Sequence, residues 1–363
     1  MQGISTINIF FEIIQCGIGT RKQLSCVIPH SQWKEVYDLA GKQTLLGITF
    51  SGIEKLPTEQ RPPKEILLQW FQYSEVIKRR NRLMNERAAK VSHKFRQEGF
   101  RNCILKGQGI AQLYPDPYLR TPGDIDIWLE GGSKKILEYV RRYTPESKPV
   151  YHHIDFPIIK DTEIEVHFTP SWMYNPIGNR RLQRFFKIQA ESIYNNHAET
   201  IEGEFPTPTV LFNRIYILLH IYRHLFQEGI GLRQLLDYYF VLKQEVTDKE
   251  HKESIRMLDS LGLIRFTSAM MHIMKEVFGL DEKYMLLSPD KKEGEFLLNE
   301  IIKTGNFGYY DNRYKRVSKE NEFAHFLNSL QRTRRLLFHY PGETLWSPYF
   351  KIWHFFWRKR RGG

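Results

Sequence analysis

The sequence predicts an α+β fold in which a small mixed sheet is flanked by a helical region on its N-terminal side and a helical domain on its C-terminal side. A long N-terminal stretch repeats its apolar residues at helical spacing, and helical patterns return after residue 209. Between them, residues 100–170 contain short runs with the period of two that is typical of strands. We expect three parts, over residues 1–99, 100–200 and 201–363.

The N-terminal part is predicted to be helical. Residues 1–60 look mostly helical, and the opening stretch STINIFFEIIQCGIG lacks the basic leading segment and the cleavage pattern of a signal peptide. From Pro62 and Pro63 to Gly99, apolar residues recur at spacings of three, four and seven, which predicts one helix of up to about nine turns. Nowhere does the chain offer the ~18 uninterrupted apolar residues that a membrane-spanning helix needs.

Short strands and helices alternate in the central part. NCILKG and DIDIWL are runs typical of strands, with a short helix, GIAQLY, between them. A helix is predicted at roughly 134–143, and IDFPIIKDTEIEVHF after it should form two strands joined at Lys160, Asp161 and Thr162. This order predicts a small sheet with antiparallel additions, covered by helices on one side.

The C-terminal part is predicted to be a helical domain. LFNRIYILLHIYRHLF, LRQLLDYYFVLK, RFTSAMMHIMKEVF and GEFLLNEIIK are all amphipathic or core-like. We expect linkers near residues 195–209 and 340–349. His220 and His224 share a helix face, but no Glu follows His220 and no third zinc ligand is evident. They are interpreted either as hydrogen-bonded core and surface histidines or as residues that face a cleft.

The composition indicates an anionic partner. With 53 Lys and Arg against 41 Asp and Glu, the formal charge is +12, which attracts nucleotides, nucleic acid or an acidic membrane surface. Three cysteines without a CxxC pair suggest neither a disulfide framework nor a cysteine zinc site, so a cytoplasmic location is predicted.

The C-terminal segment SPYFKIWHFFWRKRRGG interleaves aromatic and basic residues. Three interpretations stay open: a helix docked on the body, an amphipathic segment on an anionic membrane, and a nucleic-acid contact. The second would make the protein peripheral to the inner membrane.

Acidic residues share strand faces in the central part. Asp124 and Asp126 lie on one face of DIDIWL, ~7 Å apart along the backbone, and would repel one another unless a divalent cation lay between them. Glu163, Glu165 and His167 lie on one face of TEIEVHF. If the two strands pair, Glu165 can face the aspartates, and carboxylate oxygens are the ligands that Mg²⁺ prefers.

A phosphate-binding turn is predicted before the aspartates. ILKGQGIAQLY ends a strand in Lys106 and Gly107 and opens a helix. A glycine at this junction lets the backbone approach a phosphate, and Lys106 and the later Arg120 add positive charge.

The pattern LKGQGIAQLYPDPYLRTPGDIDIWL followed by EVHF resembles the nucleotidyltransferase family proteins of bacteria, relatives of the DNA polymerase beta superfamily, of CCA-adding enzymes and of abortive-infection toxin nucleotidyltransferases. The resemblance is closest over residues 100–170. It implies that Asp124 and Asp126 are metal-binding aspartates, that Glu165 is the third acid and that Gly107 is the glycine of the turn. The turn departs from the family, which has Gly-Gly or Gly-Ser where this chain has Lys-Gly-Gln.

These residues together predict a Mg²⁺-dependent nucleotidyltransferase that moves a nucleoside monophosphate from an NTP to an acceptor hydroxyl on a small molecule, RNA or protein. The predicted catalytic and metal-binding residues are Asp124, Asp126 and Glu165, and the predicted nucleotide-binding residues are Lys106, Gly107, Arg120 and His167. The alternative is a non-catalytic nucleotide- or polyanion-binding module on the same fold. Convergence of the three carboxylates in an open cleft favours the enzyme, and a buried or dispersed arrangement favours the module.

Overall fold

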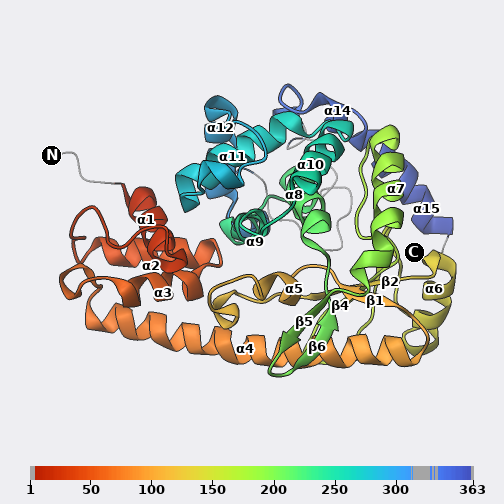
Figure 1. Ribbon diagram of the computed structural model, residues 1–363, viewed down its shortest axis with the longest axis horizontal. Helices are drawn as coiled ribbons and strands as arrows, with labels where there is room; N and C mark the ends of the chain where they lie inside the picture. Colours follow the sequence, from red (N-terminus) through yellow and green to blue (C-terminus); the bar gives the residue numbers. More distant parts are fainter. Residues whose placement is uncertain (1–4, 312, 314–327, 329–330, 332–333, 361–363) are drawn as a thin grey trace.

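The computed structural model describes residues 5–311, 313, 328, 331 and 334–360, and it confirms the α+β fold. The N-terminal helices are α1 (Thr6–Ile18), α2 (Gln32–Lys42) and α3 (Leu46–Lys55), followed by a 3-10 turn, η1 (Thr58–Gln60). The predicted long helix is α4 (Lys64–Gln97), which begins after Pro63 and runs along one side of the molecule (Figure 1). Gly99, just past its end, has φ +76°, a backbone conformation that glycine adopts without strain.

The central sheet has the strand order β1-β2-β4-β3 and is mixed, as predicted. Its strands are β1 (Asn102–Ile104), β2 (Ile125–Leu129), β3 (His153–Asp155) and β4 (Ile164–His167). β2 and β4 are parallel, while β1 and β3 pair antiparallel to β2 and β4. The one-turn helix α5 (Gln108–Ala111) and a 3-10 turn, η2 (Pro117–Leu119), connect β1 to β2, and α6 (Gly132–Tyr143) follows β2.

The predicted antiparallel strand pair is present as β3 and β4, but its connection differs. β3 ends at Asp155, so the connection runs over residues 156–163 and is longer than the expected turn at Lys160–Thr162. Pro157 follows Phe156 directly, and a proline cannot donate a ladder hydrogen bond, which is a physical reason for the early end.

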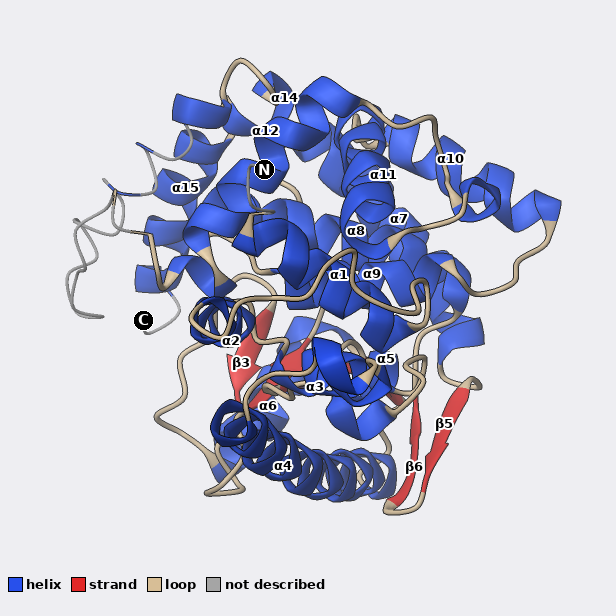
Figure 2. Cartoon of the chain, turned by 90° about the vertical axis from the view of Figure 1, so that its left-hand side faces the viewer, coloured by secondary structure: helices blue, strands red, loops and turns tan. Residues whose placement is uncertain are grey.

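Helices cover both faces of the sheet, and the expectation of cover on one side was wrong. Ile125, Ile127 and Leu129 point into a closed core with α4 and α6, and Figure 2 shows the strands between α4 and the other helices. On the opposite face, the ring of Trp128 packs nearly parallel to Phe212 in α8, with the centroids 6.2 Å apart. An apolar ring on this face requires cover, and Asp126 lies two residues before it on the same face of β2.

The segment near residues 195–209 is a β-hairpin, so the predicted linker was wrong there. β5 (His197–Thr200) and β6 (Gly203–Pro206) pair antiparallel around a two-residue turn. Ala198 and Phe205 are buried in the sheet core, whereas Glu199 and Glu204 are exposed. A single apolar residue per strand is too weak a pattern for strands to be predicted from sequence.

The C-terminal part is helical, as predicted. Its helices are α7 (Pro176–Ile193), α8 (Val210–Gln227), α9 (Leu232–Leu242), α10 (Asp248–Ser260), α11 (Ile264–Phe278), α12 (Lys291–Thr304), α14 (Pro341–Thr344) and α15 (Ser347–Arg360), with 3-10 turns η3 (Glu282–Tyr284) and η4 (Asn306–Gly308). The prediction of a linker near residues 340–349 was also wrong, because helices α14 and α15 lie there. Glu343 of α14 is buried there and accepts hydrogen bonds from the backbone N–H groups of Tyr174 and Asn175.

One continuous apolar core joins α1 to α3 with α8 to α12. Figure 1 shows these two groups of helices side by side above α4. The boundaries near residues 99 and 200 therefore stay a prediction. In the described part of the chain, no helix is long and apolar enough to cross a membrane.

Candidate active site

Asp126 and Glu165 are direct neighbours across the parallel β2–β4 pair, and Trp128 and His167 are the pair two residues further on. The sequence predicted that Glu165 could face the aspartates if these two strands paired, and the strands do pair. Ligand atoms of Asp126, Glu165 and His167 lie within 4.8 Å of one another, and Asp126 is 2% exposed. The sheet thus holds two carboxylates and an imidazole within the reach of one ion.

Lys106 lies close to both aspartates and offsets part of their negative charge. It follows β1, where the Leu105 N–H donates to the Asp126 carbonyl, 2.9 Å away, so its side chain emerges beside β2. Its Nζ lies 3.1 Å from Oδ2 of Asp126 and 3.9 Å from Oδ2 of Asp124. Burial opposes the charge on Lys106, but the carboxylates of Asp124 and Asp126 outweigh it and raise the pKa.

His167 is the second cation of the cluster. Its Nε2 lies 2.9 Å from Oδ1 of Asp126 and 3.4 Å from Oε2 of Glu165. Burial lowers the pKa of His167, but these two carboxylates raise it to about 9. Burial likewise raises the pKa of Glu165, and the hydrogen bond from His167 with the nearby His153 and Lys106 lowers it to about 2. Glu165 is therefore ionised at neutral pH.

Gly107 forms the predicted strand-to-helix turn. Its φ of +55° is unfavourable for any residue with a Cβ, and a Cβ would lie 3.4 Å from the Asp124 carbonyl oxygen. The turn therefore holds the backbone close to Asp124, although helix α5 after it has only four residues.

Arg120 lies near the site, but its charge is engaged elsewhere. Its Nε and Nη2 donate to the two carboxylate oxygens of Asp237 in α9, at 2.7 and 2.8 Å, and Arg120 is only 4% exposed. The hydroxyl of Tyr114 donates to the same carboxylate at 2.7 Å. This buried pair joins the sheet region to the C-terminal helices.

A small pocket lies beside Asp124 and is lined by Lys106, Gly107, His220, Arg233 and Phe307, among others. Its volume of about 20 Å³ is room for a single water, so a phosphate can enter only if these side chains move. His220 lines this pocket, which agrees with the interpretation that it faces a cleft.

The predicted residues thus fall into two groups. The structure brings Lys106, Asp124, Asp126, Glu165 and His167 together, and it ties Arg120 to a carboxylate 117 positions away. Residues 29–279 match a protein family described as an uncharacterised nucleotidyltransferase. The chain belongs to this nucleotidyltransferase family. No curated protein matches the chain.

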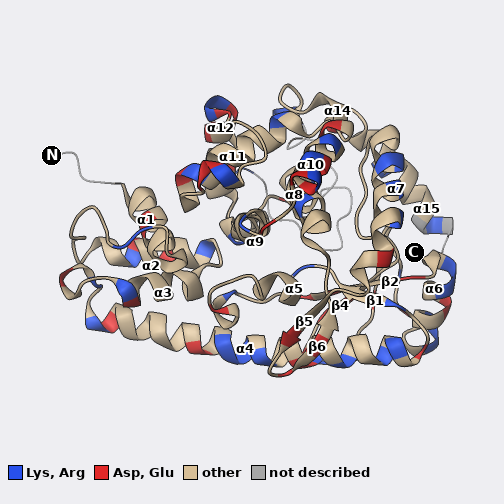
Figure 3. Ribbon diagram, viewed as in Figure 1, with Lys and Arg blue, Asp and Glu red and all other residues tan. Residues whose placement is uncertain are grey.

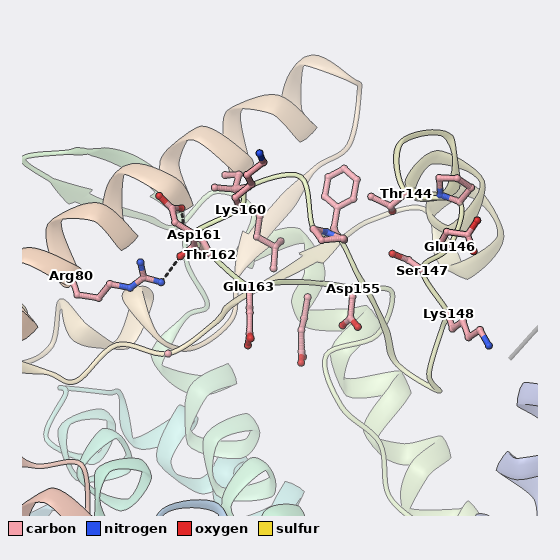
Figure 4. Close-up of a pocket in the computed structure, with 17 residues that line it drawn as sticks. Arg80, Thr144, Glu146, Ser147, Lys148, Asp155, Lys160, Asp161, Thr162 and Glu163 are labelled. Atoms are coloured by element: carbon pink, nitrogen blue, oxygen red, sulfur yellow. Dashed lines mark hydrogen bonds between the residues drawn. The ribbon is translucent and has the colours of Figure 1, made fainter. Parts of the chain in front are cut away.

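The chain has a second, much larger cleft on the Glu165 side. It has a volume of about 1350 Å³ and is lined by Arg80, Asp155, Glu163 and Glu165 and by the loops at residues 144–148 and 156–163. In Figure 4, Asp155 and Glu163 project to the same side of the strands. Gly123 borders both this cleft and the small pocket, Asp124 lines the small pocket and Glu165 lines the large cleft, whereas the buried Asp126 lines neither.

Three further polar residues lie at the candidate site and were not among the predicted site residues: Arg233, His152 and His153. Arg233 of α9 is 8% exposed, donates through Nη1 to the Thr121 carbonyl at 2.8 Å and, among the described residues, has no partner for Nε. His152 and His153 precede and begin β3, and His153 pairs in register with His167. Two adjacent histidines at the start of a strand are the only sequence signal for His152 and His153, and this signal is weak.

Proposed function

We propose that the chain is a metal-dependent nucleotidyltransferase that transfers a nucleoside monophosphate from an NTP to an acceptor hydroxyl and releases pyrophosphate. The observation that carries the proposal is the side-by-side arrangement of Asp126 and Glu165 on neighbouring strands, in a member of a nucleotidyltransferase family. Asp124, one third exposed, stands at the start of the same strand.

The donor atoms fit a divalent cation. Lys106 already bridges Asp124 and Asp126 through one ammonium group, so a positive charge is stabilised at this position. Asp124, Asp126 and Glu165 offer the hard carboxylate oxygens that suit Mg²⁺. When bound, the metal would neutralise phosphate charge and favour ionisation of the acceptor hydroxyl.

The protein's own side chains divide the remaining work. Glu165 borders the large cleft and is ionised, so it would accept a hydrogen bond from an acceptor hydroxyl that enters there and orient it, while the hydroxyl proton passes to water. The acceptor oxygen then bonds to the α-phosphorus as the bond to pyrophosphate breaks. Lys106 and Arg233 line the small pocket on the opposite side and would stabilise the phosphate charge.

The size of the large cleft supports a bulky acceptor. Small-molecule sites are ~300–1,000 Å³, and the cleft is about 1350 Å³. Its wall carries Asp155 and Glu163 but also Arg80, Lys148 and Lys160, so it offers both signs of charge to a polar acceptor.

A second candidate function is a non-catalytic binding module, and the burial of Asp126 favours it. Both oxygens of this carboxylate already face a cation, and the small pocket has almost no free volume. The charge distribution does not add to this candidate, because Lys and Arg lie on most helices, including α4, α6 and α7, and not on one face (Figure 3).

A screen of labelled NTPs with Mg²⁺ against small molecules, tRNA and proteins, read for pyrophosphate release, separates the two candidates. The enzyme predicts release with at least one NTP, and release should be lost in Asp126→Asn. Nucleotide binding that persists in Asp126→Asn, without release in the wild type under any condition, supports the module.

We further propose that the outer face of α15 rests on an anionic membrane. Its inner face docks on the body, where Phe350 lies against Tyr151 and Trp172, with centroids 5.2 and 6.0 Å apart. Ile352 and Phe356 point outward and are 54% and 58% exposed. An aromatic and aliphatic surface beside a basic end is typical of interfacial helices.

A further inference from the structure

Three histidines stand together at the edge of the Glu165 carboxylate. The Nε2 of His152 lies 3.1 Å from Nδ1 of His153, and that Nδ1 lies 3.3 Å from Oε2 of Glu165. The Nε2 of His167 lies 3.4 Å from the same oxygen. One ligand atom from each of the three imidazoles falls within 4.8 Å of the others.

Three of these separations are those expected between neighbouring ligand atoms of a metal ion. Zinc–nitrogen and zinc–oxygen bonds of ~2.0–2.2 Å in tetrahedral geometry place neighbouring ligand atoms about 3.3 Å apart. The contacts of 3.1, 3.3 and 3.4 Å between His152, His153, Glu165 and His167 lie close to this value.

Hydrogen bonding among the described residues accounts for the cluster only in part. Nδ1 of His152 and Nδ1 of His167 are both buried without a partner there. In both rings the orphaned Nδ1 is the nitrogen other than the Nε2 that meets His153 or Glu165, so the position of an ion is defined by the Nε2 contacts and not by these two atoms.

A carboxylate also stands behind one of the imidazoles. The second nitrogen of His153, Nε2, lies 3.8 Å from Oδ1 of Asp155. A carboxylate that accepts a hydrogen bond from the outer nitrogen of a histidine strengthens the ring as a metal ligand, and at 3.8 Å Asp155 is near enough to form this bond after a small shift of its exposed side chain. Asp155 and Glu165 are paired in register across β3 and β4, so the backbone holds this arrangement.

We propose that His152, His153 and His167, with Glu165 beside His153 and His167, form a binding site for a borderline divalent metal ion such as Zn²⁺ or Co²⁺. Imidazole ligands suit these ions, whereas Mg²⁺ takes oxygen ligands. The site shares Glu165 and His167 with the proposed nucleotidyltransferase centre, but ion binding by the histidines does not require that nucleotide transfer take place.

Titration of the full chain with Co²⁺ tests the site, because imidazole-bound Co²⁺ absorbs visible light. The wild type should bind one Co²⁺ with a visible absorption band, Zn²⁺ should abolish the band, and excess Mg²⁺ should leave it. His153→Gln should weaken Co²⁺ binding at least about tenfold, on the order of the loss that follows removal of groups around a metal. His152→Gln should act similarly, and circular dichroism reports whether this buried variant is folded.

Asp124→Asn is the matched control, since this residue belongs to the proposed nucleotide centre and not to the histidine cluster. It should lose pyrophosphate release and keep the Co²⁺ band. Absence of a band in the wild type, or an undiminished band in a folded His153→Gln, would overturn the histidine site. Pyrophosphate release with Mg²⁺ would then still support the nucleotidyltransferase, so the two proposals fail separately.

Discussion

The Nζ of Lys106 lies 3.1 Å from Oδ2 of Asp126, and the aspartate side chain is fully buried behind it. This contact links the loop after β1 to the centre of β2. Each group therefore supplies the charge that makes the other tolerable in the interior.

Replacing one partner of this pair should destabilise the fold. Asp126→Asn leaves Lys106 and His167 as buried cations without their shared carboxylate, and we expect a loss on the order of 3 kcal/mol in the free energy of unfolding. The double variant Lys106→Met with Asp126→Asn should recover part of that loss, because the unpaired ammonium is gone. Urea unfolding measures both. An Asp126→Asn single variant as stable as the wild type would show that the pair contributes nothing.

Arg120 and Arg233 should differ in what they contribute. Arg120→Gln breaks the buried pair with Asp237 and should lower stability by about 3–5 kcal/mol. Among the described residues no carboxylate lies at salt-bridge distance from Arg233, so Arg233→Gln should leave stability nearly unchanged and raise the KM for NTP at least about tenfold, the effect of ~1.4 kcal/mol. Thermal melts and steady-state kinetics separate the two. Equal KM values for Arg233→Gln and wild type would remove Arg233 from the phosphate site.

Glu343 should make stability depend on pH. Burial raises the pKa of this carboxyl to about 7, despite the backbone N–H groups of Tyr174 and Asn175 that favour its charged form. The folded chain then holds a proton that the unfolded chain releases above about pH 4.5, so stability should fall as the pH rises from there to about 7.

The test of Glu343 compares Glu343→Gln with the wild type at pH 5 and pH 8. The free energy of unfolding of the variant, relative to wild type, should rise between these values by on the order of 2–4 kcal/mol. Taking a difference between pH values cancels the cost of the lost acceptor oxygen. A relative stability that does not change with pH would mean that Glu343 ionises as in water.

The outer face of α15 should control membrane binding without controlling the fold. Ile352→Ser with Phe356→Ser removes exposed apolar surface and should abolish co-sedimentation with anionic vesicles while the melting temperature changes little. Phe350→Ala is the matched inner-face variant and should lower the melting temperature, because it unpacks the ring from Tyr151 and Trp172. Wild-type binding should weaken as salt rises. Equal sedimentation of the outer-face variant and wild type would reject the membrane proposal.

Much of the fold follows from local periodicity. The helical spacing from Pro63 to Gly99 corresponds to α4, and the alternation around Asp126 and Glu165 corresponds to β2 and β4. The period of two puts the acids on one strand face, but it does not fix which residue lies opposite which. That register depends on the whole sheet.

Other parts depend on contacts that sequence spacing does not carry. Arg120 was predicted as a free phosphate ligand because its partner, Asp237, lies 117 positions away on a helix with no local signal. Arg233 is also distant in sequence from the sheet. It lies at the site because helix α9 packs beside the loop that contains Thr121. The hairpin around Phe205 was missed because one apolar residue per strand cannot be told from a loop.

Nucleotide transfer by Asp126→Asn, Glu165→Gln and the double variant tests the central claim most directly. Transfer of label from an α-labelled NTP should require a divalent metal in the wild type, and each single variant should lose at least about 100-fold in kcat/KM. If the two carboxylates act as one unit, the double variant should be little worse than either single variant. Transfer at the wild-type rate by a folded Asp126→Asn or Glu165→Gln would contradict the assignment of this pair as the catalytic centre.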